Sequence, residues 1–289
     1  MDTNELLKRV RKIEIKSRGL SNHIFAGEYH SAFKGRGMAF SEVREYQYGD
    51  DFRSVDWNVT ARFNHPYIKV FEEERELTVM LLIDVSGSGE FGTRSRLKED
   101  MITEIAAVLS FSAIQNNDKV GVILFSDRIE GFIPPKKGRQ HILRIIRELI
   151  DFKPQSRRTD ITVSLRYLVN VIKKRSTSFL ISDFLTENYE DALKIAGRKH
   201  DLVGLWIYDI RERELPGVGL IKVRDAETGK IAWVNSSSIK VRNAYQEHYL
   251  KKQEETVDLL NKNGVDYVQI ATHEDYVKPL MRLFNRRAK

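Results

Sequence analysis

Apolar and polar residues alternate along most of the chain in blocks that predict strands and helices in turn. The apolar run at residues 78–85 is nearly continuous, which is typical of a strand buried on both faces of a sheet. Further strands are predicted at residues 120–125, 129–133, 178–182, 202–208 and 265–271. Helices are predicted at residues 97–115, 140–150, 161–174, 189–199, 239–262 and 275–287. This alternation predicts an α/β fold with a doubly wound, mostly parallel sheet.

Three other regions interrupt or precede this rhythm. Residues 1–20 predict a short charged N-terminal helix, because Leu6, Leu7, Val10 and Ile13 share one face. Residues 21–76 are rich in glycine and aromatic residues, and they predict a β-rich subdomain of strands and loops. Residues 211–237, within the main domain of residues 77–289, predict a β-hairpin insertion.

Composition narrows the classes of site that the chain can hold. It has 289 residues, 41% of them hydrophobic, and no cysteine, which excludes disulfides, thiolate catalysis and cysteine-ligated metals. No apolar run approaches the length of a membrane span, and the N-terminus lacks the apolar core of a secretory signal. We therefore expect a soluble, cytoplasmic protein.

The net charge of +7 is unevenly distributed. Residues 136–175 hold twelve basic and three acidic residues, a local charge of +9, and they include Thr159. The solvated outer face of amphipathic helices is the first interpretation of this segment. An acidic protein partner is the second, and nucleic acid is the third, since no array of stacking aromatic residues or helix-turn-helix pattern accompanies the charges.

Oxygen-bearing side chains follow two of the predicted strands and precede one helix. The first strand ends in Asp84-Val85-Ser86-Gly87-Ser88, a later strand ends at Asp183, and Thr159 lies just before a helix. Ligands of open α/β sheets lie beyond the carboxyl ends of the strands, so these segments are expected at one edge. Asp, Ser and Thr are also ordinary helix-capping residues, and it is the order of all three segments that favours a binding site.

This order resembles the metal ion-dependent adhesion site of von Willebrand factor type A domains. The resemblance implies that Ser86, Ser88 and Thr159 ligate one divalent ion directly, while Asp84 and Asp183 hold its waters. Hydroxyl and water oxygens suit Mg²⁺ or Mn²⁺. With few direct carboxylates, such an ion would attract an acidic side chain of a partner.

One position departs from that pattern. Arg158 stands where a small residue, usually glycine, often precedes the threonine of the family. Its side chain would either crowd the loop or, together with Arg157, bind an anionic partner.

A second segment carries a more specific resemblance. From Gly35 to Glu74 the sequence includes Glu42-Val-Arg44, Tyr48-Gly49-Asp50-Asp51 and Asp56-Trp57, and Leu215-Pro-Gly follows later. This is similar to the bacterial family called domain of unknown function 58, over nearly the whole chain. The resemblance implies a partnership with a MoxR-type AAA+ ATPase. Many members carry N-terminal membrane helices, which are missing here, so we expect the short, soluble form.

Charges of both signs alternate with aromatic residues within that segment, and residues 1–77 contain thirteen basic and thirteen acidic residues. One interpretation is a solvated face with ion pairs, each worth about 0–1 kcal/mol. The other is a polar network that attaches this subdomain to the main domain or to a partner.

The sequence contains no recognisable catalytic motif. Ser86 and Ser88 are not in Gly-x-Ser-x-Gly, Gly35-x-Gly37 is not completed to a dinucleotide fingerprint, and no Walker A sequence occurs. We therefore predict a non-enzymatic, metal-dependent protein-interaction module that works with a MoxR-type ATPase on an acidic client, in a chaperone-like or regulatory role. The alternatives are a metal-dependent phosphate-ester hydrolase using Asp84 or Asp183, and a nucleic-acid-binding protein using residues 136–175.

Overall fold

The chain divides into two compact units. The computed structural model describes residues 3–21, 29, 32, 39–72, 77–90, 97–225 and 229–288. The larger unit comprises Met1–Phe33 and Thr78–Lys289, and the smaller one comprises Lys34–Leu77. Gly35, Gly37 and Glu74 of the predicted family signature lie outside the described residues.

A six-stranded sheet forms the centre of the larger unit, in the order β10-β7-β6-β3-β4-β5. The strands are β3 (Thr78–Asp84), β4 (Lys119–Phe125), β5 (Ile129–Lys136), β6 (Thr177–Ser182), β7 (Asp201–Tyr208) and β10 (Asp266–Ala271). Neighbouring strands are parallel except for β5, which runs antiparallel to β4 at one edge. This confirms the predicted doubly wound, mostly parallel sheet.

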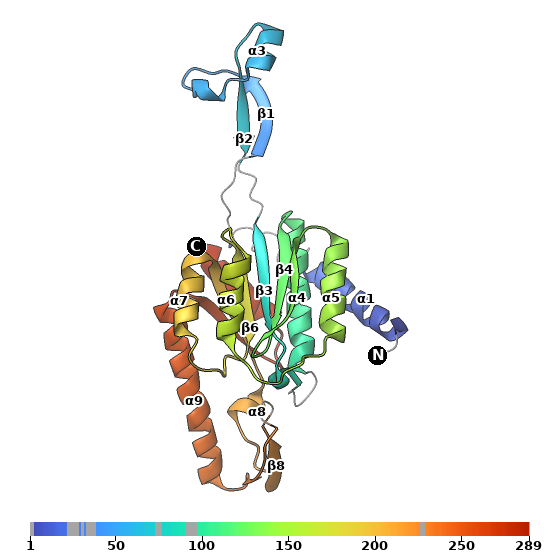
Figure 1. Cartoon of the computed structure of the whole chain (residues 1–289), viewed down its shortest axis with the longest axis vertical. Helices are drawn as coiled ribbons and strands as arrows, with labels where there is room; N and C mark the ends of the chain where they lie inside the picture. Colours follow the sequence, from blue (N-terminus) through green and yellow to red (C-terminus); the bar gives the residue numbers. More distant parts are fainter. Residues whose placement is uncertain are drawn as a thin grey trace. The chain divides into compact units, whose positions relative to one another are not determined.

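Helices cover both faces of this sheet (Figure 1). They are α1 (Thr3–Leu20), α4 (Lys98–Gln115), α5 (Arg139–Asp151), α6 (Ile161–Val171), α7 (Glu190–Lys199), α9 (Ile239–Lys262) and α10 (Val277–Ala288). The helices α6, α7 and α9 pack against the sheet face that carries Met80 and Leu82. On β3, side chains alternate between the two faces, and α4 packs against β3, β4 and β7. The helix α1 packs against α4 and α5.

The edge strand β5 extends further than the sequence pattern predicted. The expected strand ended before Pro134, whereas β5 continues through both prolines to Lys136. Proline is tolerated there because an edge strand has one unpaired side. The chain comes so close to β4 that a Cβ on Gly121 would lie 2.9 Å from the Pro135 nitrogen.

The predicted insertion is a hairpin preceded by a short helix. The strands β8 (Leu220–Arg224) and β9 (Ile231–Asn235) pair antiparallel. Before them lies α8 (Ile210–Arg213), which the sequence pattern did not predict. A capping box stabilises the start of α8. The Asp209 side chain accepts a hydrogen bond from the Arg211 backbone N–H, and the Glu212 side chain accepts one from the Asp209 backbone N–H. Figure 1 shows α8 beyond the carboxyl ends of the central strands.

The smaller unit is less β-rich than predicted. Its strands β1 (Ala39–Glu45) and β2 (Tyr67–Glu72) form a two-stranded antiparallel sheet. Between them lie a 3-10 turn, η2 (Phe52–Ser54), and the helix α3 (Trp57–Phe63), where strands and loops were expected. The helix begins because Asp56 accepts hydrogen bonds from two backbone N–H groups, and it ends at Asn64 in the left-handed conformation (φ 57°).

A helix that crosses a membrane must be both long and predominantly apolar. Among the residues that the structure describes, no helix combines the length and the apolar character needed to cross a bilayer.

Candidate metal site

The Asp84 turn lies at the carboxyl edge of the central sheet. Because β3 and β6 pair in parallel with Ile83 opposite Ile181, the next residues of the two strands, Asp84 and Ser182, lie side by side. The Ser182 hydroxyl donates to Asp84 Oδ2 at 2.7 Å. Asp84 is 6% exposed, so the turn presents a buried carboxylate. Beyond it the chain forms a 3-10 turn, η3 (Gly87–Glu90).

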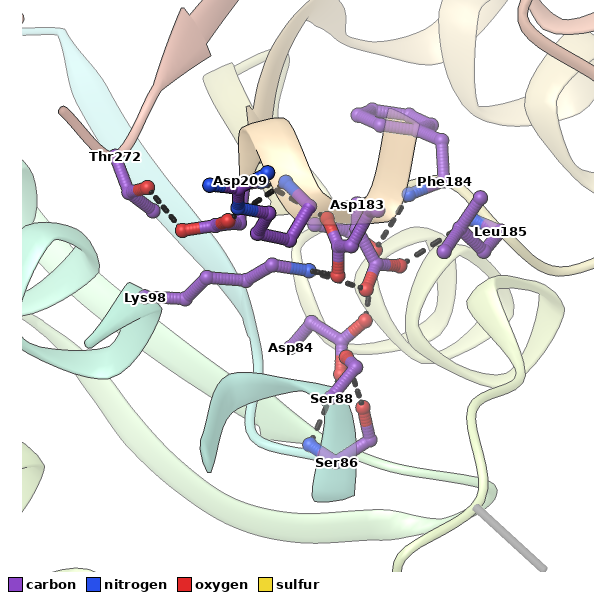
Figure 2. A network of polar contacts seen from close by, with 12 residues as sticks. Asp84, Ser86, Ser88, Lys98, Asp183, Phe184, Leu185, Asp209 and Thr272 are labelled. Atoms are coloured by element: carbon purple, nitrogen blue, oxygen red, sulfur yellow. Dashed lines mark hydrogen bonds and ion pairs between the residues drawn. The ribbon is translucent and has the colours of Figure 1, made fainter. Parts of the chain in front are cut away.

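Both serine hydroxyls of the turn belong to the same polar group, which Figure 2 shows. The Ser86 backbone N–H donates to Asp84 Oδ1 at 3.0 Å, and the Ser86 and Ser88 hydroxyl oxygens are 3.1 Å apart. The Ser88 side chain also hydrogen-bonds to Asp183. The structure thus brings together four of the five predicted metal-site residues through direct or shared contacts.

Thr159 lies in a loop that contacts both sides of this group. The Gly87 N–H donates to the Arg157 carbonyl at 3.0 Å, and the Thr186 hydroxyl donates to the Thr159 carbonyl at 3.3 Å. The loop precedes α6, as predicted, but the residue that caps the helix is Asp160. Thr159 Oγ1 is buried, and it has no hydrogen-bond partner among the described residues. A buried hydroxyl without a partner is costly, so this oxygen is available to bind a ligand.

A buried lysine that the sequence did not single out completes the group. Lys98, the first residue of α4, is only 2% exposed. Its ammonium pairs with Asp183 Oδ2 at 3.1 Å and also with Glu212 of α8. The polar group therefore continues from the Asp84 turn through Asp183 and Lys98 to the start of the hairpin insertion (Figure 2).

The charges of this cluster do not balance. Asp84, Asp183, Glu212 and Lys98 together carry a net charge of −2 when all are ionised. Burial, and then the charge of Asp183, raises the pKa of Asp84 to about 6. Burial likewise raises the pKa of Glu212 to about 7, against the attraction of Lys98. Burial is the first cause of both raised pKa values, and the nearby charge of Asp183 adds to each, so ionising Asp84 and Glu212 is unfavourable here.

Lys98 and Asp183 have shifts in the opposite sense. Burial alone would lower the pKa of Lys98, but Asp183 and Glu212 raise it to about 12. Burial alone would raise the pKa of Asp183, but Lys98 and the Ser88 hydrogen bond hold it below its ordinary value. Asp183 is therefore ionised throughout the neutral range, and Lys98 is its counter-charge.

The oxygen set fits a small divalent cation. Among the described residues, no group of three or more His, Asp or Glu side chains is placed to hold a metal. A cation at the Asp84 turn would therefore depend on the hydroxyls of Ser86, Ser88 and Thr159, with Asp84 and Asp183 nearby. Such hard oxygen donors suit Mg²⁺ or Mn²⁺, and a net charge of −2 is the charge that one such ion offsets.

The two arginines before Thr159 lie at the surface. Arg157 and Arg158 are both exposed, so the Arg158 side chain does not fill the buried space around Thr159. The Arg158 backbone N–H donates to the Ser156 hydroxyl at 3.3 Å. Arg144, Arg147, Lys173 and Lys174 of the basic segment are exposed too, as a solvated face requires.

The sequence offered little sign of Lys98, Glu212 or Ser182. A lysine at a helix start is usually solvated, and the helix dipole does not favour a cation there. Glu212 lies in Arg211-Glu212-Arg213, which has the appearance of a surface segment. Only for Ser182 was there a signal, because it immediately precedes Asp183 at the end of a predicted strand.

Comparison with protein families assigns the chain. Residues 42–255 match the family described as "Protein of unknown function DUF58". The chain belongs to this family. A DUF58 relative is the uncharacterized protein Rv1480 of Mycobacterium tuberculosis strain H37Rv, 26% identical over 292 residues that cover all of this chain and 92% of that protein. The uncharacterized protein YeaD of Bacillus subtilis is 29% identical over 109 residues, which cover 38% of this chain and 25% of YeaD.

Solved structures share the fold of this DUF58 protein. An aerotolerance-related membrane protein from Bacteroides fragilis superimposes with a TM-score of 0.51 at 15% identity, over 73% of this chain and 98% of that one. The VWA domain of SpRpn10 gives a TM-score of 0.41 at 11% identity, over 73% of this chain and 95% of that one. The match to the Bacteroides fragilis protein shows a shared fold, and the larger unit has the α/β fold with a mostly parallel sheet that the sequence predicted.

Proposed function

We propose that this DUF58 protein is a non-catalytic protein-interaction module that holds one divalent cation, Mg²⁺ or Mn²⁺, at the Asp84 turn. The observation that carries the proposal is the buried Thr159 hydroxyl, which has no hydrogen-bond partner among the described residues and belongs to a loop that contacts the Asp84 turn. A cation there would take the Thr159 hydroxyl oxygen as a ligand, and it would offset the negative charge of the acidic side chains. Bound to hydroxyls, it would keep Lewis acidity available for a carboxylate of a partner protein.

This chain's own residues give the site its shape. Ser182 and the Ser86 backbone hold both oxygens of Asp84, so the carboxylate is fixed before any ligand arrives. Lys98 and the Leu185 N–H do the same for Asp183. Because both acids are already oriented, little conformational entropy would be lost when a ligand binds.

Titration with metal tests the site directly. Isothermal titration calorimetry with Mg²⁺ and with Mn²⁺ is expected to show one site in the wild type and none in Asp84→Ala. The matched control is Asp50→Ala, which removes a carboxylate of the smaller unit and is expected to leave binding unchanged. Equal and negligible heats in the wild type and in Asp84→Ala would refute the proposal.

The proposed partners are an acidic client protein and a MoxR-type AAA+ ATPase, which would supply mechanical work. The basic segment around Thr159 supports the first, and the family resemblance supports the second. Co-expression with a MoxR-type ATPase of the same genome, followed by size-exclusion chromatography with Mg²⁺ or with EDTA, tests the second. Separate elution in both buffers would refute the ATPase partnership and leave the metal site unaffected.

A further inference from the structure

A cavity adjoins the Asp84 turn within the larger unit. Its volume is about 390 Å³, and its described lining includes Asp84, Ser86 and Gly87. This volume is within the range of roughly 300–1,000 Å³ that is usual for ligand pockets. The cavity therefore borders the proposed cation site at Asp84 and Ser86, while Ser88, Thr159 and Asp183 are not among its described lining residues.

Part of the cavity lining is apolar. It is formed by Ile102 of α4, by Leu149 near the end of α5, by Phe152 just after that helix, and by Val85 of the turn itself. Leu149 and Phe152 are only partly buried, so part of this apolar surface is accessible. Filling the cavity with an apolar group would remove that surface from water, which favours binding.

Because charged residues line the cavity, the kind of ligand that it would bind depends on whether a cation is present at the turn. Glu99 and Asp84 contribute two carboxylates, and Lys153 and Arg157 contribute two cationic groups. These charges balance by themselves. With a divalent cation at the turn the lining would become positive, so an anionic group would be attracted near Asp84, while the apolar part of the lining would still favour an apolar group.

We propose, on the basis of the proposed function, that this cavity binds a short partner segment in which a carboxylate lies next to an apolar side chain. The carboxylate is held at the Asp84 turn beside Arg157, and the apolar side chain enters the cavity against Leu149 and Phe152. The cavity thereby selects among acidic partners, because an acidic residue without an apolar neighbour leaves the apolar wall exposed to water.

Straight-chain carboxylates are the simplest probes of this arrangement. Acetate, butanoate and hexanoate are titrated against the full chain with and without Mg²⁺, and binding is followed by ligand-observed NMR. With Mg²⁺, affinity is expected to rise with chain length, by up to about fourfold for each added methylene group. Hexanamide, which has the same alkyl chain and no charge, is expected to show no dependence on Mg²⁺.

A filled cavity provides the decisive variant. Leu149→Trp places a larger side chain in the cavity, and it is expected to abolish the gain with chain length while Mg²⁺ and acetate still bind. The matched control is Leu143→Trp, an identical change of another partly buried leucine on the same helix that is not in the described lining. This control is expected to retain the gain, and circular dichroism verifies the fold of both variants.

The outcomes separate this inference from the proposed function. If Mg²⁺ binds but acetate and hexanoate bind equally, the inference is wrong and the metal site stands. If the gain with chain length persists in Leu149→Trp, the inference is also wrong, because the chain then lies elsewhere. If Mg²⁺ does not bind the wild type, the proposed function fails, and the metal-dependent carboxylate site described here fails with it.

Discussion

Two charge-rich regions of this protein differ in where their charges lie. In the larger unit, Lys98 pairs with Asp183 and Glu212, and the lysine side chain is 2% exposed. In the smaller unit, Arg44 forms a bidentate pair with Asp50 at 2.8 and 2.9 Å, and its side chain is 37% exposed. The arginine pair has two hydrogen bonds of good geometry, yet it is accessible to solvent.

This difference in burial determines how much each ion pair contributes to the stability of the fold. Exposed ion pairs are screened by solvent and contribute little, whereas breaking a buried pair leaves an uncompensated charge in a medium of low polarity. The Arg44 hydrogen bond, together with the Gln47 backbone, lowers the pKa of Asp50. In the buried cluster, burial is the first cause of the two upward shifts, those of the Asp84 and Glu212 pKa values. Burial, more than the number of charged residues, separates a candidate site from a solvated surface.

Removal of the buried ammonium should have the largest effect. Lys98→Met would leave Asp183 and Glu212 without their cation, and we expect the free energy of unfolding to fall by about 3–5 kcal/mol. Urea unfolding in EDTA, followed by circular dichroism, measures this change. The additional substitution Glu212→Gln should restore part of the loss, because it removes one of the two unpaired carboxylates.

Lys69→Met is the matched control for that experiment. Lys69 pairs with Asp56 at 3.4 Å, and its side chain is 41% exposed, so no measurable change is expected. Similar destabilisation by Lys69→Met and Lys98→Met would show that burial does not distinguish the two regions.

The pH dependence of the metal-free protein should show an intermediate effect. The folded pKa values of Asp84 and Glu212, about 6 and about 7, lie above the ordinary values of 3.8 and 4.5. An acid with a raised pKa contributes stability that is fully present below its ordinary value and is lost as pH rises through the folded value. Stability should therefore fall as pH rises from about 4 to about 7, by up to about 3 kcal/mol for each of the two acids at about 1.4 kcal/mol per pKa unit.

Asp183 limits stability on the acidic side, because its pKa is lowered and its contribution is lost as pH falls through the folded value. Thermal unfolding in EDTA across this range is the measurement, with Asp84→Asn as the variant in which the upper slope should flatten. A stability that rises between pH 4 and pH 7 would contradict the raised pKa values of Asp84 and Glu212.

The exposed pair should have the smallest effect. Arg44→Gln combined with Asp50→Asn removes both charges and retains an acceptor for the Gln47 N–H, which donates to Asp50 at 2.8 Å. Solvent already screens this pair, so the midpoint of thermal unfolding is expected to stay within experimental error. A loss comparable with that of Lys98→Met would instead favour the alternative interpretation, in which these charges form a structural network.

The fold was predicted correctly where a residue pattern is compatible with only one structure. The apolar run before Asp84 can be buried only inside a sheet covered on both faces, and β3 is that strand. Prediction failed at Trp57–Phe63, where the glycine- and aromatic-rich segment was expected to form strands and loops and a helix formed. There the Asp56 cap determined the conformation, and a capping residue followed by aromatic residues is also compatible with a turn.

Within the candidate site, the sequence by itself determined which oxygens reach the sheet edge. Asp84, Ser86, Ser88 and Asp183 follow strands whose order and direction fix their carboxyl ends at one edge. Only the tertiary structure decided that Lys98 and Glu212 join them, since burial of a charge depends on which distant segments close over it. It also decided that the Thr159 hydroxyl is buried without a partner, because a lone hydroxyl is costly only where the fold excludes water.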